Sequence, residues 1–201
     1  EGAEEVALFV VERGAPGVSL SEPVISLGLR NCPAADVTFT GVEVAEKNLL
    51  TAEGKKACVE LANDFAAAVA AMAVGVVSGS YQAAKAYAAE RYQGGRMIID
   101  YDLVRQMLSN LLVVAESGKA LVRAMAAAAD AGNGFPLTGS GLVLLTEQAS
   151  RVTSDGVQCL GGYGYMEEYG QEKRMRDAKQ IQSLLGAAPA KRLELMEAVL
   201  R

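Results

Sequence analysis

The sequence predicts a mainly α-helical protein, with an up-down helical bundle preceded by a partial β-domain. Two observations predict this fold class. From Thr51 onward, apolar residues recur at the spacing of amphipathic helices. Before that point, short apolar runs alternate with turn-forming glycine and proline, which is typical of strands. We therefore expect a partial β-domain over residues 1–50 and a C-terminal helical bundle over residues 51–201.

Composition excludes several classes of function. Of the 201 residues, 51% are hydrophobic and 21% are charged, as in ordinary globular domains. The net charge of −5 offers no basic footprint, so we do not expect a nucleic-acid partner. Histidine is absent from the sequence, which excludes Ser-His and Cys-His catalysis and a histidine-built metal site within the chain.

Cysteine usage and the apolar runs bear on the compartment. Cys32, Cys58 and Cys159 lie far apart, as reduced cysteines of an intracellular protein do. The longest apolar run, Phe65–Val77, is too short to span a bilayer. The chain starts with acidic residues where a signal peptide would be basic. We expect a cytoplasmic location, no membrane span, and a chain that is part of a longer protein or is completed by a partner.

The N-terminal part contains three candidate strands. They are the apolar runs Val6–Val11 and Val24–Leu29 and the alternating segment Asp36–Val44, in which Gly41 allows a bulge. So few strands cannot bury both faces of a sheet. We expect them to need further strands or a covering helix.

The first predicted helix runs from a cap at Thr51 to about Arg91. Its large apolar residues form a stripe at helical spacing, and alanine and glycine on the other faces allow close helix packing. The stripe consists of Leu61, Phe65, Val69, Met72 and Val76.

Three more helices are predicted after the first. They span about Ile99–Ala131, Gly139–Leu160 and Pro189–Leu200. Gly132 and Pro136 end the first of these, and Pro189 suits the first turn of the last.

A glycine cluster follows the third long helix. Gly161, Gly162 and Gly164 would each cost a helix interior about 1 kcal/mol relative to alanine. Such a cluster indicates either a helix end with a turn, or a backbone platform for a cofactor phosphate or an adjacent subunit. It is not the dinucleotide-binding fingerprint, because no strand precedes it. Gln158, one helical turn earlier, could present its amide there.

The region around these glycines resembles the C-terminal signature of acyl-CoA dehydrogenases. The matching residues are Val157-Gln158, Gly161–Tyr165 and Arg176–Ala178. Leu27–Arg30 and Asp36–Val44 also resemble the end of the central β-domain of that family. The resemblance covers nearly all of the chain.

The resemblance implies a cofactor and a substrate. In the family, FAD lies between the β-domain, the bundle and a neighbouring subunit, and an acyl-CoA thioester lies against the flavin. A glutamate removes an α-proton while the β-hydrogen leaves as hydride. Arg91 matches the arginine that pairs with the flavin pyrophosphate of an adjacent subunit. Gln158 and Gly162, with Gly161 in the same turn, match positions that face the pyrophosphate.

Without the family resemblance, the same residues can also be interpreted as structural or solvent-exposed groups that bind no ligand. Arg91 could be a solvated cation at a helix end, and Arg176-Asp177 a structural ion pair. Glu167 and Glu168 could form an exposed acidic turn.

The resemblance fails at the position of the catalytic base. Leu185 stands where the family has its glutamate. Some members place the base on the first long helix, where this chain has Phe65 and Ala66. Asp64 is the remaining candidate, but it would point about 100° away from Phe65 on a helix.

Other departures affect cofactor contacts implied by the family. Gly94 replaces a phenylalanine, and Tyr101-Asp102 replace a Phe-Gln pair. Ala187 replaces a threonine, and Pro189 replaces a polar contact.

Two hypotheses follow. In the first, the chain belongs to an acyl-CoA dehydrogenase-like flavoprotein subunit that uses FAD for α,β-dehydrogenation of an acyl-CoA. In the second, it is a non-catalytic subunit that pairs with an active one. The family implies a homo- or hetero-oligomer in both cases and suggests electron-transfer flavoprotein as a partner.

Overall fold

The computed structural model describes residues 6–132, 134–186 and 188–200. The acidic start of the chain and Ala187 therefore lie outside the described residues. The chain forms two units. The first holds the segment up to Ser26 together with Arg30–Ala62, and the second holds Leu27–Leu29 and the chain from Asn63 onward.

The first unit contains short antiparallel pairs of strands. β1 (Leu8–Phe9) pairs with β4 (Leu49–Thr51), and β2 (Val18–Leu20) pairs with β3 (Val37–Phe39). The turn η1 (Glu46–Asn48) precedes β4.

The predicted strands are mostly shorter in the structure, and one of them does not form. The prediction of a strand over Val24–Leu29 is wrong, because Val24 makes only an isolated bridge to Ala34. Ile25 is 91% exposed, whereas Leu27–Leu29 belong to the second unit, where Leu29 packs against the core. Val37 and Phe39 of β3 are also at least half exposed, as expected for strands without a covering layer.

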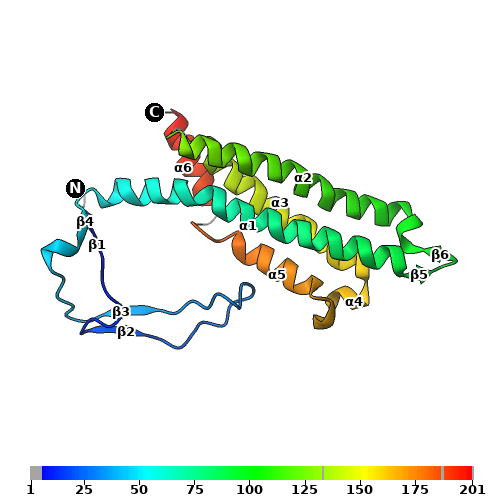
Figure 1. Cartoon of the computed structure of the whole chain (residues 1–201), viewed down its shortest axis with the longest axis horizontal. Coiled ribbons are helices and arrows are strands. Elements are labelled where there is room, and N and C mark those ends of the chain that lie inside the picture. Colours follow the sequence, from blue (N-terminus) through cyan, green and yellow to red (C-terminus); the bar gives the residue numbers. More distant parts are fainter. Residues whose placement is uncertain (1–5, 133, 187, 201) are drawn as a thin grey trace. The chain divides into compact units, whose positions relative to one another are not determined.

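The second unit is the predicted up-down bundle (Figure 1). Its long helices are α1 (Gly54–Glu90, which begins in the first unit), α2 (Asp102–Asp130) and α3 (Leu137–Leu160). The hairpin β5–β6 and the turn η2 join α1 to α2. Their bounds are Tyr92–Gln93, Arg96–Met97 and Ile98–Asp100.

The C-terminal part of the bundle is built from shorter elements. They are α4 (Gly162–Tyr165), η3 (Glu167–Tyr169), α5 (Gln171–Ile181) and α6 (Ala188–Leu200). α2 packs along α3, and α3 also contacts α5 and α6. The predicted helices are confirmed with boundaries shifted by up to three residues, whereas the sequence analysis did not separate α4, η3 and α5.

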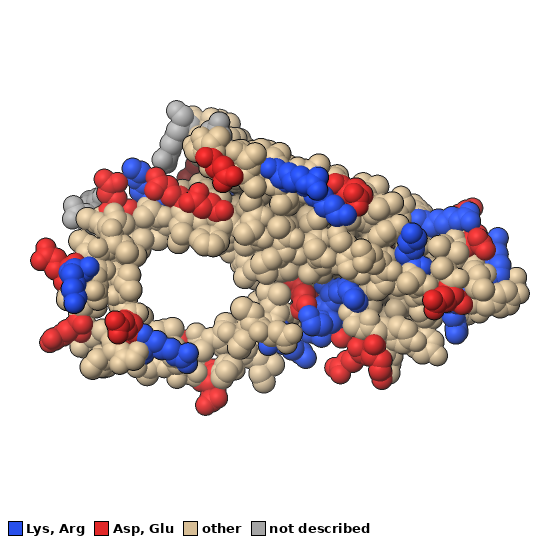
Figure 2. Space-filling model, viewed as in Figure 1, with Lys and Arg blue, Asp and Glu red and all other residues tan. Residues whose placement is uncertain are grey.

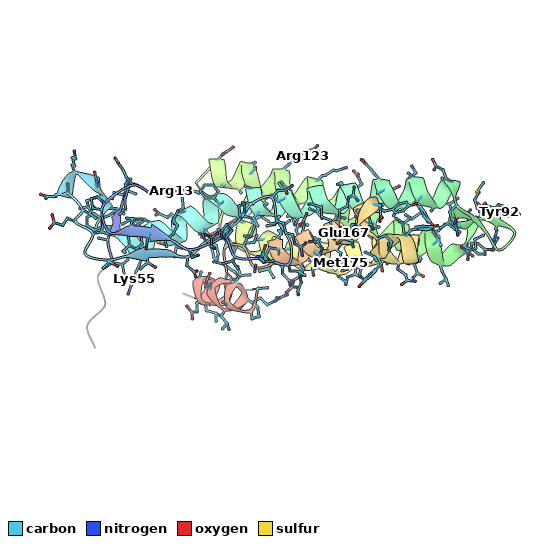
Figure 3. The ribbon with its side chains drawn as sticks, turned by 90° about the horizontal axis from the view of Figure 1, so that it is seen from below. Arg13, Lys55, Tyr92, Arg123, Glu167 and Met175 are labelled. Atoms are coloured by element: carbon cyan, nitrogen blue, oxygen red, sulfur yellow. The ribbon has the colours of Figure 1, made fainter. Side chains whose placement is uncertain are left out.

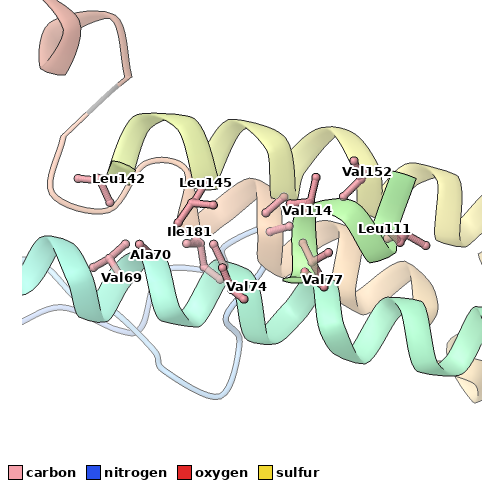
Figure 4. Close-up of a cluster of buried hydrophobic side chains, with 14 of the residues drawn as sticks. Val69, Ala70, Val74, Val77, Leu111, Val114, Leu142, Leu145, Val152 and Ile181 are labelled. Atoms are coloured by element: carbon pink, nitrogen blue, oxygen red, sulfur yellow. The ribbon is translucent and has the colours of Figure 1, made fainter. Parts of the chain in front are cut away.

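Buried aliphatic side chains from four helices meet in the core (Figure 4). Leu111 from α2, Val152 from α3 and Ile181 from α5 are each at most 1% exposed. The α1 residues that point to this cluster are Val69, Ala70, Val74 and Val77.

The buried face of α1 differs from its stripe of large apolar residues. Of that stripe, Val69 is buried, whereas Leu61, Phe65 and Met72 are 44–54% exposed. The alanine face is buried instead, at Ala66, Ala70, Ala73, Ala84 and Ala88. Small side chains bring neighbouring helices close, and Val74 of α1 indeed lies against Gly118 of α2. Periodicity alone does not distinguish these two faces.

Among the described residues, α1 is long and apolar enough to cross a membrane. It extends well beyond the apolar run Phe65–Val77 on which the prediction of no membrane span was based. A core helix meets the same criterion. The burial of its alanine face against α2, α3 and α5 accounts for the apolar composition of that face.

Candidate functional site

Arg91 is the first residue after α1. Its backbone N–H donates to the carbonyl of Tyr87 at 2.9 Å, and its own carbonyl accepts from Ile98 N–H at 2.9 Å. The side chain is exposed and its guanidinium carbon lies 5.7 Å from the centre of the Tyr163 ring. Within the described chain, Arg91 has no ion pair. Its charge is therefore available to a ligand or a partner.

The glycine cluster is a tight turn between α3 and α4. Gly161 has φ of 59° and ψ of −133°, a conformation that favours glycine, and its N–H donates to the carbonyl of Gln158 at 3.1 Å. A Cβ at Gly161 or Gly162 would meet no described atom within 4 Å. Packing within the chain therefore does not explain the glycine at 162. The side chain of Gln158 is also exposed.

Three tyrosine rings bring Arg91 and the glycine turn together. Tyr163 lies 6.2 Å from Tyr87 and 5.2 Å from Tyr169, measured between ring centres. Tyr87 and Tyr169 meet edge to face at 5.8 Å. Sequence reasoning missed this cluster, although Tyr87 one helical turn before Arg91, and a tyrosine within the glycine cluster, were visible signals.

Two departures from the family sequence contact each other at the hairpin end of the bundle, where Tyr92 is labelled (Figure 3). Tyr101 Oη donates to the carbonyls of Gln93 and Gly94 at 3.0 and 2.8 Å. A side chain at Gly94 would overlap this hydroxyl. The Arg96 guanidinium lies 4.0 Å from the Tyr101 ring centre. Tyr101 therefore supports the hairpin that follows Arg91.

The candidate positions for a catalytic base lie in surroundings that range from the hydrophobic core to the exposed surface. Leu185 packs against the hydrophobic core and has φ of 59°, which a leucine rarely adopts. Ala66 is buried, and Phe65 is half exposed. Asp64 is exposed, and 27 residues separate it from Arg91. At about 1.5 Å per residue that spacing is about 40 Å along the helix, so Asp64 does not join Arg91 in one site of this chain.

Arg176 and Asp177 have structural partners. Arg176 pairs with Glu172 and donates from Nη1 to the Leu27 carbonyl at 2.7 Å. Asp177 pairs with Lys173 and accepts from the Leu29 N–H at 2.7 Å. The hydrogen bond to Glu172 raises the pKa of Arg176 above its usual value. These contacts support the interpretation of the Arg-Asp pair as structural.

A cavity of about 530 Å³ lies beside the acidic turn, lined in part by Glu167, Met175 and Arg176. Glu167 and Met175 are labelled in Figure 3. On the face visible in Figure 2, acidic and basic side chains alternate without a broad patch of one sign. In the described part of the chain, no group of His, Cys, Asp or Glu is arranged to hold a metal ion.

The chain is similar to enzymes that act on acyl-CoA thioesters. The family model "Acyl-CoA dehydrogenase, C-terminal domain" matches residues 52–200. Cyclohex-1-ene-1-carbonyl-CoA dehydrogenase of Syntrophus aciditrophicus is 33% identical over 92% of this chain and 46% of its own length.

Solved structures agree with this match. Butyryl-CoA dehydrogenase from Megasphaera elsdenii superposes with a TM-score of 0.89 at 27% identity, over 98% of this chain and 52% of that one. A structure described as the electron transferring flavoprotein of Acidaminococcus fermentans superposes with a TM-score of 0.88 at 31% identity. The match covers 97% of this chain and 52% of that chain. The chain thus spans about half the length of the proteins it matches. It belongs to the acyl-CoA dehydrogenase family and corresponds to its C-terminal half.

Proposed function

We propose that this chain is part of an FAD-binding acyl-CoA dehydrogenase-type subunit whose assembly carries out α,β-dehydrogenation of an acyl-CoA thioester. The observation that carries the proposal is the position of Arg91. This exposed arginine, without an ion pair in the described chain, is held beside an exposed glycine turn.

The surroundings of Arg91 fit a diphosphate group. A guanidinium presents several N–H donors in a planar fork, which suits phosphate oxygens. The open space at Gly161 and Gly162 would let a ligand approach the backbone closely. Gln158 adds an exposed amide at the same turn. Arg91, Gln158, Gly161 and Gly162 would together hold the diphosphate of FAD. When FAD is bound, its flavin supplies the hydride acceptor.

The reaction needs a base, and this chain has no carboxylate at the two positions where the family places it. Dehydrogenation transfers the α-proton to a carboxylate and the β-hydrogen, with its electron pair, to the flavin. Leu185, Phe65 and Ala66 cannot take a proton, and the carboxylate of Asp64 is exposed. The base would come from another position of the longer protein or from a partner chain.

The packing of Leu185 favours a second candidate function. Its side chain contacts the hydrophobic core, and so it contributes to stability where the family has an ionisable group. A non-catalytic subunit that pairs with an active one, in a homo- or hetero-oligomer, would tolerate this change. Arg91 would then complete the flavin site of its partner.

The remaining expectations depend on the longer protein. Residues 1–50 would complete a β-domain together with a preceding segment, because their short strands expose apolar side chains. The names of two similar enzymes specify different acyl-CoAs, cyclohex-1-ene-1-carbonyl-CoA and butyryl-CoA, so they do not select one acyl group for this protein. Electron-transfer flavoprotein is the proposed electron acceptor, and the cytoplasmic location stays a prediction.

A visible absorption spectrum of the purified native assembly tests the proposal. We expect a flavin band that bleaches when acyl-CoAs are added without oxygen. A flavin band that no acyl-CoA in a broad panel bleaches would support the non-catalytic candidate. Absence of flavin from the assembly, also after incubation with FAD, would contradict both candidates.

Replacing Leu185 distinguishes the source of the base. If this chain once held the base, Leu185→Glu should create or accelerate bleaching, whereas Leu185→Gln should not. An assembly that bleaches equally with all three residues draws its base from elsewhere.

A further inference from the structure

Tyr163 lies between the two parts of the candidate site. It follows Gly162 directly in the chain, and its ring lies 5.7 Å from the guanidinium carbon of Arg91. We infer that Tyr163 is a positioning residue that holds Arg91 toward the anionic ligand. This inference rests on the proposed function, because it assigns a role within the same flavin site.

Arg91 needs such support to bind an anion well. Its side chain is exposed, and it has no ion pair in the described chain. An arginine side chain that is free in solution loses rotamer entropy when it is fixed. A residue that restricts Arg91 before the ligand arrives reduces that cost of binding.

The Tyr163 ring can restrict Arg91 without competing for its donors. A guanidinium within about 6 Å of a ring centre is attracted to the ring face by about 0.5–1 kcal/mol at exposed sites. The ring face is not a conventional hydrogen-bond acceptor, so the guanidinium N–H groups stay available to phosphate oxygens. A carboxylate at the same place would neutralise the charge that the ligand needs.

The ring itself is fixed from two sides. Tyr87 reaches it from α1, one helical turn before Arg91, and Tyr169 reaches it from η3. Tyr163 therefore connects the end of α1 to the glycine turn through packed rings. Tyr165, two residues later, is 80% exposed and makes no ring contact in the described chain, so it provides a matched control.

The test is the affinity of the native assembly for FAD, measured after the flavin has been removed. We expect Tyr163→Leu to weaken binding about threefold to fivefold, as expected from loss of the ring interaction. Tyr163→Phe keeps the ring face and should bind like wild type, as should Tyr165→Leu. Thermal unfolding shows whether Tyr163→Leu still folds, and Tyr163→Ile offers a second apolar replacement.

A double-mutant cycle separates positioning from simple packing. If Tyr163 acts through Arg91, Tyr163→Leu should have no further effect on FAD affinity once Arg91 is replaced by methionine. Equal effects with and without Arg91 would overturn the inference. So would an unchanged affinity of a folded Tyr163→Leu assembly that binds FAD. A wild-type assembly that fails to bind FAD would instead overturn the proposed function, and this inference with it.

Discussion

The backbone N–H of Leu29 donates a 2.7 Å hydrogen bond to Oδ1 of Asp177, 148 residues later in the chain. Leu29 has φ of 49°, and its side chain packs against the core of the bundle. The preceding residue of α5, Arg176, donates to the carbonyl of Leu27. Arg176 and Asp177 thus attach the segment Leu27–Leu29 to the bundle.

Replacing Asp177 should destabilise the second unit. Asp177→Ala leaves the Leu29 N–H without its acceptor in a partly buried place, which should cost about 2–3 kcal/mol in the free energy of unfolding. Denaturant unfolding measures this loss. Lys173→Met is the matched control, since it removes the half-exposed partner of Asp177 but keeps the bond to Leu29, and should cost less than about 1 kcal/mol. If Asp177→Ala and Lys173→Met lost equal free energies of unfolding, the ion pair with Lys173, and not the hydrogen bond to Leu29, would account for the stabilisation by Asp177.

Gly156 permits a buried polar contact between helices. Gln171 Nε2 of α5 donates to Ser80 Oγ of α1, and both side chains are fully buried. A Cβ at Gly156 of α3 would overlap both groups. Gly156→Ala should therefore lower the free energy of unfolding by about 2–4 kcal/mol.

A second glycine provides the control for this prediction. A Cβ at Gly75 of α1 would meet no described atom, so Gly75→Ala should be neutral or stabilise by up to about 1 kcal/mol through helix propensity. Thermal unfolding of the two variants gives the comparison. A Gly156→Ala protein as stable as Gly75→Ala would contradict the packing described here.

Much of the bundle could be predicted from the sequence, because long helices repeat their pattern over many turns. The spacing of Leu103, Met107 and Leu111 and the stop at Gly132 placed α2 closely. The buried face of α1 could not be predicted, since alanine is compatible with both a core and a surface position. The neighbouring helices determine which face of α1 is buried. One example is Gly118 of α2, which lies against Val74 of α1.

The site could be predicted only in part for a related reason. Arg91 and Gln158 were predicted from motif positions, whereas the role proposed for Tyr163 depends on its contacts with Tyr87 and Tyr169. The contact with Tyr87 joins residues 76 positions apart, so no local pattern reveals it. The failure of the strand Val24–Leu29 has the opposite cause. Its apolar run is locally typical of a strand, but the described unit offers it no sheet.

Cys159 should resist alkylation in the folded protein. Burial, together with the charge of Asp155, raises the pKa of its thiol to about 11. At pH 8 only about one molecule in a thousand would then hold the reactive thiolate. Cys32 and Cys58 are exposed and should react first. Mass spectrometry after iodoacetamide treatment locates the labels. Labelling of Cys159 at the rate of the exposed cysteines, without denaturant, would contradict this burial.

The attachment of α6 to α3 should weaken in acid. Arg192 donates to both carboxylate oxygens of Glu147, with Nη2 to Oε2 at 2.7 Å, and this hydrogen bonding lowers the pKa of Glu147 below its usual value of 4.5. A carboxyl group whose pKa is lower in the folded state stabilises that state above the unfolded pKa. The contribution is therefore present above about pH 4.5 and is lost as the pH falls through the lower folded value.

Hydrogen exchange of the α6 amides measures this effect between pH 6 and pH 3, after correction for the intrinsic exchange rate. Wild-type protection should fall over this range by more than that of Glu147→Gln, which cannot titrate at this position. Lys191→Met is the control on the same helix, because Lys191 pairs with Glu194 of α6 itself and not with α3. It should keep the wild-type pH dependence. If wild type and Glu147→Gln lose protection in parallel, the bond between Arg192 and Glu147 does not hold α6 in place.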